Sequence, residues 1–489
     1  MADQPASAEV KAPAYPPLPA EPVTTQHTLK VGRRTLEYSA TAGTLPVKIE
    51  GVDDPAEVFY IAYTLDAKPA ARRARPLLIA FNGGPGSASI WLHMGALGPY
   101  RVQLHDQGWM PAPPYRLEPN PHTWLAFADL LFIDPVGTGY SRAKDADANK
   151  KFWGVEADLQ AVSEFIRLYL TRSGRWSSPL FLAGESYGTT RAAGLSGHLI
   201  EMGIALSGVV LVSTILNFQT AHFDQGNDLP YALFLPTYAA TARYHKRVPA
   251  DLQKKPLGEF LAEVEAWAET EYMSALALGD RLPAKRRAAA IETLARYSGL
   301  RPEYLDLADL RPEIMRFCKE LLRDQRRTVG RLDTRFQGID ATPVTDAPDF
   351  DPSYAAILPP YTMLLNDYVR SQLGYETDRV YETLNGDVYA NWEWPKGLYT
   401  DTSAALRAAF HQNPHMKLLV TCGYYDLATP YFAARYTLEH MGLDAALRDS
   451  IRWTYYKAGH MFYIETRSLK RLTADVKKFI GWALGEAEE

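Results

Sequence analysis

The chain has 489 residues, of which 47% are hydrophobic and 22% are charged, and its formal net charge is -5. This length and composition are typical of a globular protein with a large core. The small negative charge provides no surface for a polyanion, so the sequence excludes a typical nucleic-acid-binding protein.

Residues 1–28 begin with "MADQPASAEVKAPAYPPLPAEP" and are rich in Pro and Ala, without the apolar stretch of a signal peptide. We expect a disordered leader here. The same segment also fits the start of a mature exported chain, so we expect a periplasmic or secreted protein, with the cytoplasm as the alternative. No apolar run reaches the roughly 18 residues that a transmembrane helix needs.

Short apolar runs recur along the chain and predict buried strands. Helical spacing of apolar residues occurs between them, at 155–170 and 469–484. Strands that alternate with helices predict an α/β fold with a mostly parallel central sheet flanked by helices. The predicted strands are 57–66, 76–82, 129–134, 179–184, 208–213, 417–423 and 451–457.

Residues 217–365 interrupt this alternation, since helical patterns dominate at 257–278, 284–297 and 311–325. We expect a mainly helical cap inserted over an active site that it shares with the core. The core would then consist of residues 29–216 and 366–489. The alternative is a helical second domain without a role at the site.

The stretch "LAGESYGTT" places Ser186 between Gly184 and Gly188, after an apolar strand and before helix-compatible sequence. This context is typical of a nucleophile elbow, in which glycines permit a sharp turn that presents the serine hydroxyl. We predict Ser186 to be a nucleophile. Its oxyanion would be bound by the backbone N–H of Tyr187 and by an amide of the glycine-rich loop "NGGPGS" at 82–87.

A serine nucleophile needs a base and an acid that orients the base. In enzymes with a nucleophile elbow, these residues follow the serine in the order acid, then His. His460 follows the last predicted strand on a glycine-containing loop, and Asp426 lies three residues beyond Gly423, at a strand end. We predict these two residues to complete a triad. The weaker candidates are His440, in helical sequence, and Asp444 and Asp449, between elements.

The sequence predicts no cofactor and no metal. Neither a Walker motif nor G-x-G-x-x-G is present, which argues against nucleotide binding at the glycine-rich loop. His411 and His415 have helical spacing, but Pro414 breaks the helix that would align them on a metal.

Five motifs together resemble the serine carboxypeptidase family in their order and spacing, from about residue 57 to 480. The resemblance implies an α/β-hydrolase fold with a helical insertion and release of single residues from peptide C-termini. It also implies the triad Ser186, Asp426 and His460, with the amides of Gly84 and Tyr187 as the oxyanion hole. The motifs are "NGGPGS", "NPHTWLAFADLLFIDPVGTGYS", "GESYG", "GYYDLATP" and "GHM".

The resemblance further implies that Asn82 and Glu185 bind the terminal carboxylate of a peptide substrate. An ionised Glu185 would repel that carboxylate, whereas a protonated one donates a hydrogen bond to it. We therefore expect KM to rise as Glu185 ionises. The alternative is a structural Glu185. Met461 resembles a position that lines the pocket of the leaving residue, although it would also suit plain packing.

The chain departs from the family at several positions. Ala96, in "ALGP", stands where a second glutamate is usual, and Ala80 and Ser87 replace a usual Trp and Cys. Cys318 and Cys422 are the only cysteines, so at most one disulfide can form. These departures indicate a bacterial-type member.

Two other functions fit the same residues. An acyltransferase or esterase would use the same acyl-enzyme, and a non-catalytic binding protein would use the cap as an interaction surface. Only Asn82 together with Glu185 favours a substrate with a free carboxylate. The sequence does not determine the oligomeric state.

Overall fold

A nine-stranded sheet forms the centre of the computed structural model, which describes residues 15–486. In spatial order its strands are β1 (Val23–Val31), β2 (Arg34–Val47), β3 (Ala56–Leu65), β7 (Asp129–Ile133), β4 (Leu77–Phe81), β8 (Leu180–Ser186), β9 (Gly208–Thr214), β12 (Lys417–Gly423) and β13 (Ile451–Tyr456). Neighbours are antiparallel from β1 to β7 and parallel from β7 to β13. The predicted α/β class with a mostly parallel sheet is confirmed, and every predicted strand is present.

The first two strands are not among those that the sequence predicts. β1 starts at residue 23, within the expected leader 1–28, whereas residues 1–14 lie outside the described residues. β1 is rich in Thr and other polar residues, and most of its side chains are exposed or half-buried because it pairs with β2 alone. An edge strand of this kind lacks the continuous apolar run that identifies a buried strand.

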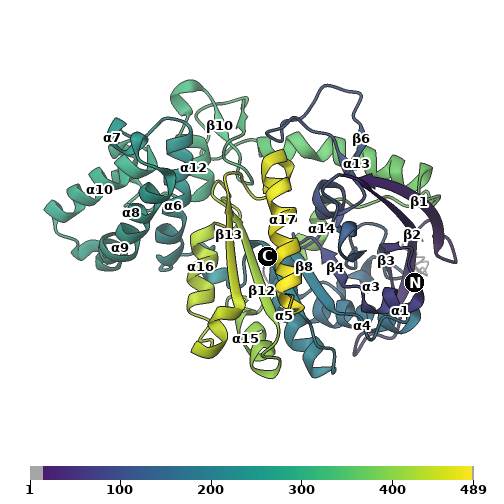
Figure 1. The fold of residues 1–489 in the computed structure, drawn as a ribbon. Helices are drawn as coiled ribbons and strands as arrows, with labels where there is room; N and C mark the ends of the chain where they lie inside the picture. The colour runs from purple at the N-terminus through teal and green to yellow at the C-terminus, as the bar shows by residue number, and fades with distance from the viewer. Residues whose placement is uncertain (1–14, 487–489) are drawn as a thin grey trace, which may run out of the picture.

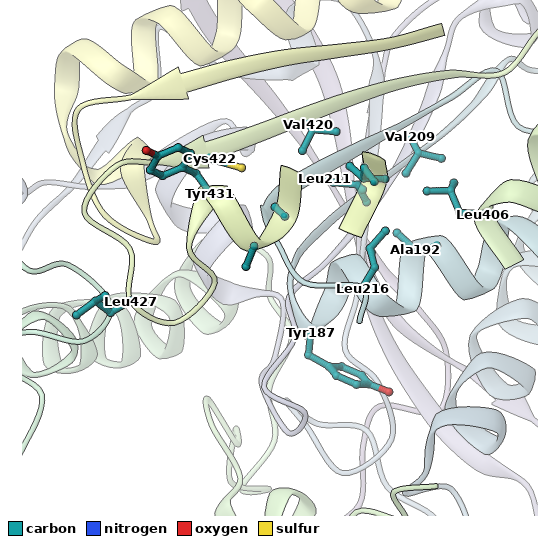
Figure 2. Close-up of a cluster of buried hydrophobic side chains, with 14 of the residues drawn as sticks. Tyr187, Ala192, Val209, Leu211, Leu216, Leu406, Val420, Cys422, Leu427 and Tyr431 are labelled. Carbon is teal, nitrogen blue, oxygen red and sulfur yellow. The ribbon is translucent and has the colours of Figure 1, made fainter. Parts of the chain in front are cut away.

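Helices cover both faces of the sheet. On one face lie α4 (Val155–Ser173), α5 (Tyr187–Glu201), α15 (Ser403–Gln412) and α16 (Tyr431–Glu439); on the other lie α2 (Ile90–Leu92), α13 (Pro352–Ser371) and α17 (Thr466–Ala483). The side chains of β9 alternate between the two cores, since Val209 and Leu211 face the first and Val210 and Val212 face the second. Figure 2 shows part of the first core, with Val209 and Leu211 near Leu406 and Ala192.

The remaining elements are short. They include α1 (Pro69–Ala74), α3 (Ala146–Lys150), α14 (Gly386–Ala390) and the strand pairs β5 (Tyr100–Val102) with β6 (Leu117–Pro119) and β10 (Thr328–Val329) with β11 (Gln337–Gly338). None of the helices within residues 15–486 is long and apolar enough to cross a membrane. Cys318 and Cys422 are both buried and free, so the one disulfide that the sequence allows does not form.

A cluster of helices is inserted between β9 and β12 and lies to one side of the sheet, next to α16 (Figure 1). It comprises α6 (Leu229–Tyr244), α7 (Ala250–Lys254), α8 (Leu257–Trp267), α9 (Met273–Leu278), α10 (Ala284–Ser298), α11 (Pro302–Leu307) and α12 (Ile314–Glu320). The helical pattern at 257–278 is divided by a π-helical turn at 268–272. α13 runs through residue 365, where we expected the insertion to end, and its Tyr361 packs on Trp91 in the second core.

Candidate active site

Ser186 lies at a sharp turn between β8 and α5, with φ 61° and ψ -131°. The flanking glycines are needed because the turn is tightly packed. A Cβ atom at Gly184 would lie 2.0 Å from the carbonyl oxygen of Gly188, and one at Gly188 would lie 2.9 Å from that of Phe81. Backbone atoms leave no room for these side chains, so the G-x-S-x-G pattern has the steric origin expected of a nucleophile elbow.

Asp426 and His460 are joined by a hydrogen bond of 2.8 Å between Oδ2 and Nδ1. Both are buried, with exposed fractions of 0% and 4%. The other oxygen of Asp426 accepts the backbone N–H groups of Ala428 and Thr429 at 2.7 and 3.0 Å, and the Thr429 hydroxyl donates to Oδ2 at 2.7 Å. These bonds hold the carboxylate in the loop after β12.

The imidazole of His460 uses Nδ1 for Asp426, which leaves Nε2 for proton transfer. Because β8, β9, β12 and β13 are parallel neighbours, the loops that follow them meet at one edge of the sheet. Among the described residues, no hydrogen bond joins the Ser186 hydroxyl to Nε2. Catalytic hydrogen bonds of this kind often tighten only when substrate binds.

The electrostatic interaction between Asp426 and His460 favours His460 as a base. Burial alone would lower the pKa of His460, but the negative charge of Asp426, the hydrogen bond to it and the charge of Glu185 together raise that pKa. Burial alone would likewise raise the pKa of Asp426, yet the attraction of His460 and hydrogen bonds from His460 and Thr429 lower it. Asp426 therefore stays ionised and stabilises a protonated imidazole.

The glycine-rich loop lies against the start of α5. A Cβ atom at Gly83 would be 2.4 Å from the backbone nitrogen of Tyr187, so only glycine permits this approach. Gly84 and Gly86 have φ values of 102° and 103°, in the region that favours glycine. The Gly84 amide donates no hydrogen bond within the described part of the chain. The geometry thus brings the loop next to Tyr187, the other predicted oxyanion donor.

Asn82 and Glu185 form a buried hydrogen-bonded pair, in which Asn82 Nδ2 donates to Glu185 Oε2 at 3.0 Å. Asn82 Oδ1 accepts the N–H of Leu92 at 3.0 Å, which fixes the orientation of the amide. The Tyr463 hydroxyl also donates to Glu185 Oε2, at 2.6 Å. The structure therefore brings together the two residues predicted for carboxylate binding and adds a tyrosine that the sequence did not indicate.

Burial raises the pKa of Glu185 to about 7. The positive charge of His460 and the hydrogen bonds from Tyr463 and Asn82 act in the opposite direction, and the negative charge of Asp426 adds to the rise. Glu185 is therefore largely protonated below neutral pH, which is the state that can donate a hydrogen bond to a carboxylate.

Arg191 supports the Asn82 side of the site and was not predicted from the sequence. Its guanidinium donates to Asp158 at 2.7 Å and to the backbone oxygen of Asn82 at 2.6 Å. The ion pair with Asp158 is fully buried below the turn. No motif marks Arg191, because its role depends on a contact between α4, α5 and the loop after β4.

We call residues 331–335, which follow the helices of the insertion, the strap. The strap contacts the two loops that carry Asp426 and His460. The Leu332 carbonyl accepts the N–H of His460 at 2.6 Å, and Asp333 Oδ2 accepts that of Gly459 at 3.0 Å. Two further backbone bonds, Thr334 N–H to Tyr425 O and Leu427 N–H to Arg331 O, are both 3.0 Å long. The strap therefore holds the acid loop and the base loop in one arrangement.

The other residues that the sequence singled out lie as follows. Met461 is buried next to His460 and belongs to the second core. His440 follows the last residue of α16 and bonds to the carbonyl of Tyr436, and Asp444 caps the 3-10 helix at 445–450 through the N–H of Ala446. Within residues 15–486, neither His440 nor Asp444 bonds to the Asp426–His460 pair.

Residues 35–218 match the sequence profile of the serine carboxypeptidase family. This segment includes Asn82, Glu185 and Ser186 but ends before Asp426 and His460, and it is shorter than the resemblance from 57 to 480 that the motifs indicated. This match therefore does not cover Asp426 and His460, whose assignment depends on their motifs and on the hydrogen bond between them.

The chain is also similar to individual members of that family. Serine carboxypeptidase-like 5 of Arabidopsis thaliana is 30% identical over 154 residues, which are 30% of this chain and 33% of that protein. The pheromone-processing carboxypeptidase KEX1 of Yarrowia lipolytica is 32% identical over 141 residues, 26% of this chain and 21% of that protein. The chain thus spans about a third or less of the length of these relatives.

Among solved structures, the chain resembles the prohormone-processing carboxypeptidase Kex1 of Saccharomyces cerevisiae, with a TM-score of 0.58 and 15% sequence identity over 91% of each chain. This likeness supports the α/β-hydrolase fold that the sequence predicted. The segment 35–218, which carries the glycine-rich loop and the turn at Ser186, is thus similar in sequence to the serine carboxypeptidase family.

Proposed function

We propose that the protein is a serine-type carboxypeptidase, which releases C-terminal residues from peptides through an acyl-enzyme intermediate. The observation that carries this proposal is the buried Asn82–Glu185 pair directly beside Ser186. An acyl-transfer site alone needs only a nucleophile, a base and an oxyanion hole. A protonated carboxyl in this place adds a binding site for a free carboxylate.

In the proposed reaction His460 Nε2 accepts the proton of Ser186 as the hydroxyl oxygen attacks the last peptide carbonyl. The amides of Gly84 and Tyr187 donate hydrogen bonds to the oxyanion. His460 then gives the proton to the leaving amine, and the C-terminal residue departs. His460 then deprotonates a water molecule that attacks the acyl carbon; the ester bond to Ser186 breaks, and His460 returns the proton to the serine oxygen. Asp426 holds the imidazole orientation throughout.

The terminal carboxylate would bind Asn82 and Glu185. One N–H of the Asn82 amide already bonds to Glu185, and the second can donate to the substrate. Glu185, in its protonated state, can donate another hydrogen bond. This pair would place the scissile bond one residue from the end of the chain, which makes the enzyme an exopeptidase.

The organisation around this site is part of the same proposal. Residues 217–365 would act as a cap and restrict access to Ser186, and Met461 would line the pocket for the leaving residue. No cofactor is needed in this chemistry. We also propose a bacterial-type branch, because both cysteines are free; the relatives named above are eukaryotic and do not support that branch. A secreted or periplasmic location, with the cytoplasm as the alternative, is a separate proposal that the free cysteines do not support.

The test compares a peptide that has a free C-terminus with the same peptide as its C-terminal amide, followed by mass spectrometry, with Ser186→Ala as the control. We expect stepwise loss of single residues from the free acid only, and none with Ser186→Ala. Turnover of esters without trimming of peptides would instead identify an esterase or acyltransferase. No turnover that depends on Ser186 would identify a binding protein.

A further inference from the structure

Tyr463 contacts Glu185 in a way that no catalytic motif explains. It lies in the 3-10 helix at 462–464, three residues after His460, and its hydroxyl donates to Glu185 Oε2 at 2.6 Å. The side chain is fully buried. The segment that carries the predicted base therefore also supplies a hydrogen bond to the carboxyl beside the nucleophile.

Both donors to Glu185 bind the same oxygen. Asn82 Nδ2 and the Tyr463 hydroxyl each donate to Oε2, at 3.0 and 2.6 Å. A carbonyl oxygen has two lone pairs and can accept both bonds, whereas the hydroxyl oxygen of a carboxylic acid would use one position for its own proton. When Glu185 is protonated, this pattern puts the proton on Oε1.

Oε1 is free to use that proton. It accepts no hydrogen bond from a residue within 15–486, whereas Oε2 accepts two. An O–H at Oε1 can therefore donate to a ligand in the site. Oε2 is held by its two donors, and Oε1 becomes the donor.

Space for the Tyr463 ring comes from the segment that ends in "ALGP". A Cβ atom at Gly95 would lie 2.6 Å from the ring carbon Cε2 of Tyr463 and 2.6 Å from the hydroxyl of Tyr361. The next residue, Ala96, has no polar side-chain atom. In this chain a tyrosine hydroxyl, and no second carboxyl, thus completes the hydrogen bonds that Glu185 makes within the described residues.

We propose that Tyr463 is a positioning residue that directs the proton of Glu185 to Oε1 and so prepares Glu185 to bind the terminal carboxylate of a peptide. This inference rests on the proposed carboxypeptidase function. Tyr463 does not touch the reacting atoms in this scheme. It acts through Glu185, and its hydroxyl also interacts with the Asn82 side chain.

Tyr463 can keep this role over a wide pH range. Burial and the negative charge of Glu185 raise the pKa of Tyr463 well above its usual value, so its hydroxyl remains a donor. The titratable groups that act on Glu185 or Tyr463 are His460, Asp426 and Tyr361. A hydrogen bond stabilises an ionised carboxylate more than a neutral carboxyl, so the Tyr463 hydroxyl lowers the pKa of Glu185.

The experiment measures binding of an N-acylated dipeptide with a free C-terminus by calorimetry between pH 5 and 9. The proteins are Ser186→Ala and the double variant Ser186→Ala with Tyr463→Phe, so that no substrate is consumed. We expect the double variant to bind roughly two- to fivefold more weakly at acidic pH. We also expect the pH at which affinity falls to rise by about one unit, because the ionised carboxylate has lost a donor.

The matched control is Tyr169→Phe, which removes the hydroxyl of a buried tyrosine on α4, and it should leave both quantities unchanged. A second readout does not depend on binding: infrared difference spectra report ionisation of Glu185, with Glu185→Gln to assign the band. An unmoved ionisation midpoint in Tyr463→Phe overturns the role of Tyr463. A shifted midpoint in a protein that trims no peptide supports that role and overturns the carboxypeptidase proposal instead.

Discussion

Glu185, next to Ser186 in the chain, is a buried carboxyl with two hydrogen-bond donors. It is 2% exposed, its pKa is raised to about 7, and its two hydrogen-bond donors both use Oε2. His460, in contrast, must be neutral to act as a base, and its pKa is also raised. Cleavage of a free-acid peptide therefore needs one group protonated and the other deprotonated, which predicts a bell-shaped pH dependence of kcat/KM.

In the proposed site, the alkaline limb of that profile belongs to Glu185. Below pH 7 its carboxyl is largely neutral and would donate to the substrate; above pH 7 it ionises and would repel the substrate carboxylate. We predict that KM for a free-acid peptide rises up to about tenfold per pH unit above 7. In Glu185→Gln, whose amide is always a donor, KM should stay nearly constant from about pH 6 to 9.

Steady-state kinetics on the free acid and on an ester of the same peptide check this prediction. The ester carries no terminal charge, so its KM should show no alkaline limb in either protein. A Glu185→Gln enzyme that keeps the wild-type rise in KM would show that another group controls substrate binding.

In the proposed reaction, Asp426 supplies the negative charge that the protonated imidazole needs. Asp426→Asn keeps the size of the side chain but removes the charge and disturbs the choice of His460 tautomer. We predict a fall in kcat of roughly 10³- to 10⁴-fold, the size of effect expected when the acid of a serine triad becomes an amide, with little change in KM. A burst experiment with an activated ester measures the acylation step directly.

Thr429→Val is the companion variant, because it removes one neutral donor to Asp426 and keeps the charge. Its effect on kcat should be far smaller, in the range of a single hydrogen bond, about tenfold at most. Equal effects of the two variants would mean that the charge of Asp426 is unimportant.

At the scale of single residues, the sequence predicts the site residues that lie in recognisable motifs. It misses residues that reach the site only through tertiary contacts. Asp426 and His460 each follow a recognisable strand and meet in a hydrogen bond, and Ser186 ends a strand of the same parallel part of the sheet. Tyr463 and Arg191 reach the site through tertiary contacts between segments far apart in the chain. No local pattern identifies such partners.

At the scale of elements, two backbone segments determine the geometry of the site. They are the turn after β8 and the loop after β4. They touch at Gly83, where a Cβ atom would lie 2.4 and 2.5 Å from the backbone nitrogens of Tyr187 and Gly188. Backbone atoms cannot rotate away as a side chain would. The glycine is thus required for the contact between the predicted oxyanion donors.

We predict that Gly83→Ala lowers the stability of the fold by about 1–3 kcal/mol and displaces the loop, with a large loss of kcat. Gly258→Ala is the matched control, since Gly258 lies in α8 with no atom within 4 Å of its added Cβ. That change should stabilise the protein by about 0.5–1 kcal/mol without affecting kcat. Denaturant unfolding and steady-state assays separate the two quantities, and full activity in Gly83→Ala would refute the steric role.

The elements that the sequence predicts well are the buried ones. β8, β9 and β12 are continuous apolar runs, and their bounds agree with the prediction within two residues. β1 and β2 are missed because their exposed faces carry polar residues. The break between α8 and α9 is missed because a π-helical turn keeps apolar residues on the same face.

In the whole molecule, the insertion and the core meet at the site through the strap. Asp333 and Arg335 form a buried ion pair of 2.6 Å within it, and Asp333 also accepts the N–H of Gly459, the residue before His460. A second link lies farther out, where Glu265 of α8 accepts bonds from Tyr431 and Arg435 of α16. The sequence predicts the insertion but not these links, because they join segments 126 to 170 residues apart in the chain.

We predict that Asp333→Ala costs about 3–5 kcal/mol, because it leaves the Arg335 charge buried without its partner. Activity and tertiary structure should then be lost together on heating, at a lower temperature than in the wild type. Asp251→Ala is the control, since its ion pair with Arg296 lies on the exposed surface of the insertion and its loss should leave Tm unchanged. A wild-type Tm in Asp333→Ala would show that the strap does not hold the His460 loop.

The most direct test of the site is capture of the acyl-enzyme. A peptide with a free C-terminus is mixed with the enzyme, quenched in acid within milliseconds, and the protein is digested and analysed by mass spectrometry. We predict a covalent adduct on Ser186 whose mass equals the peptide without its last residue, and no such adduct from the C-terminal amide. An adduct on another residue, or one produced by cleavage inside the peptide, would contradict a carboxypeptidase built on Ser186, His460 and the Asn82–Glu185 pair.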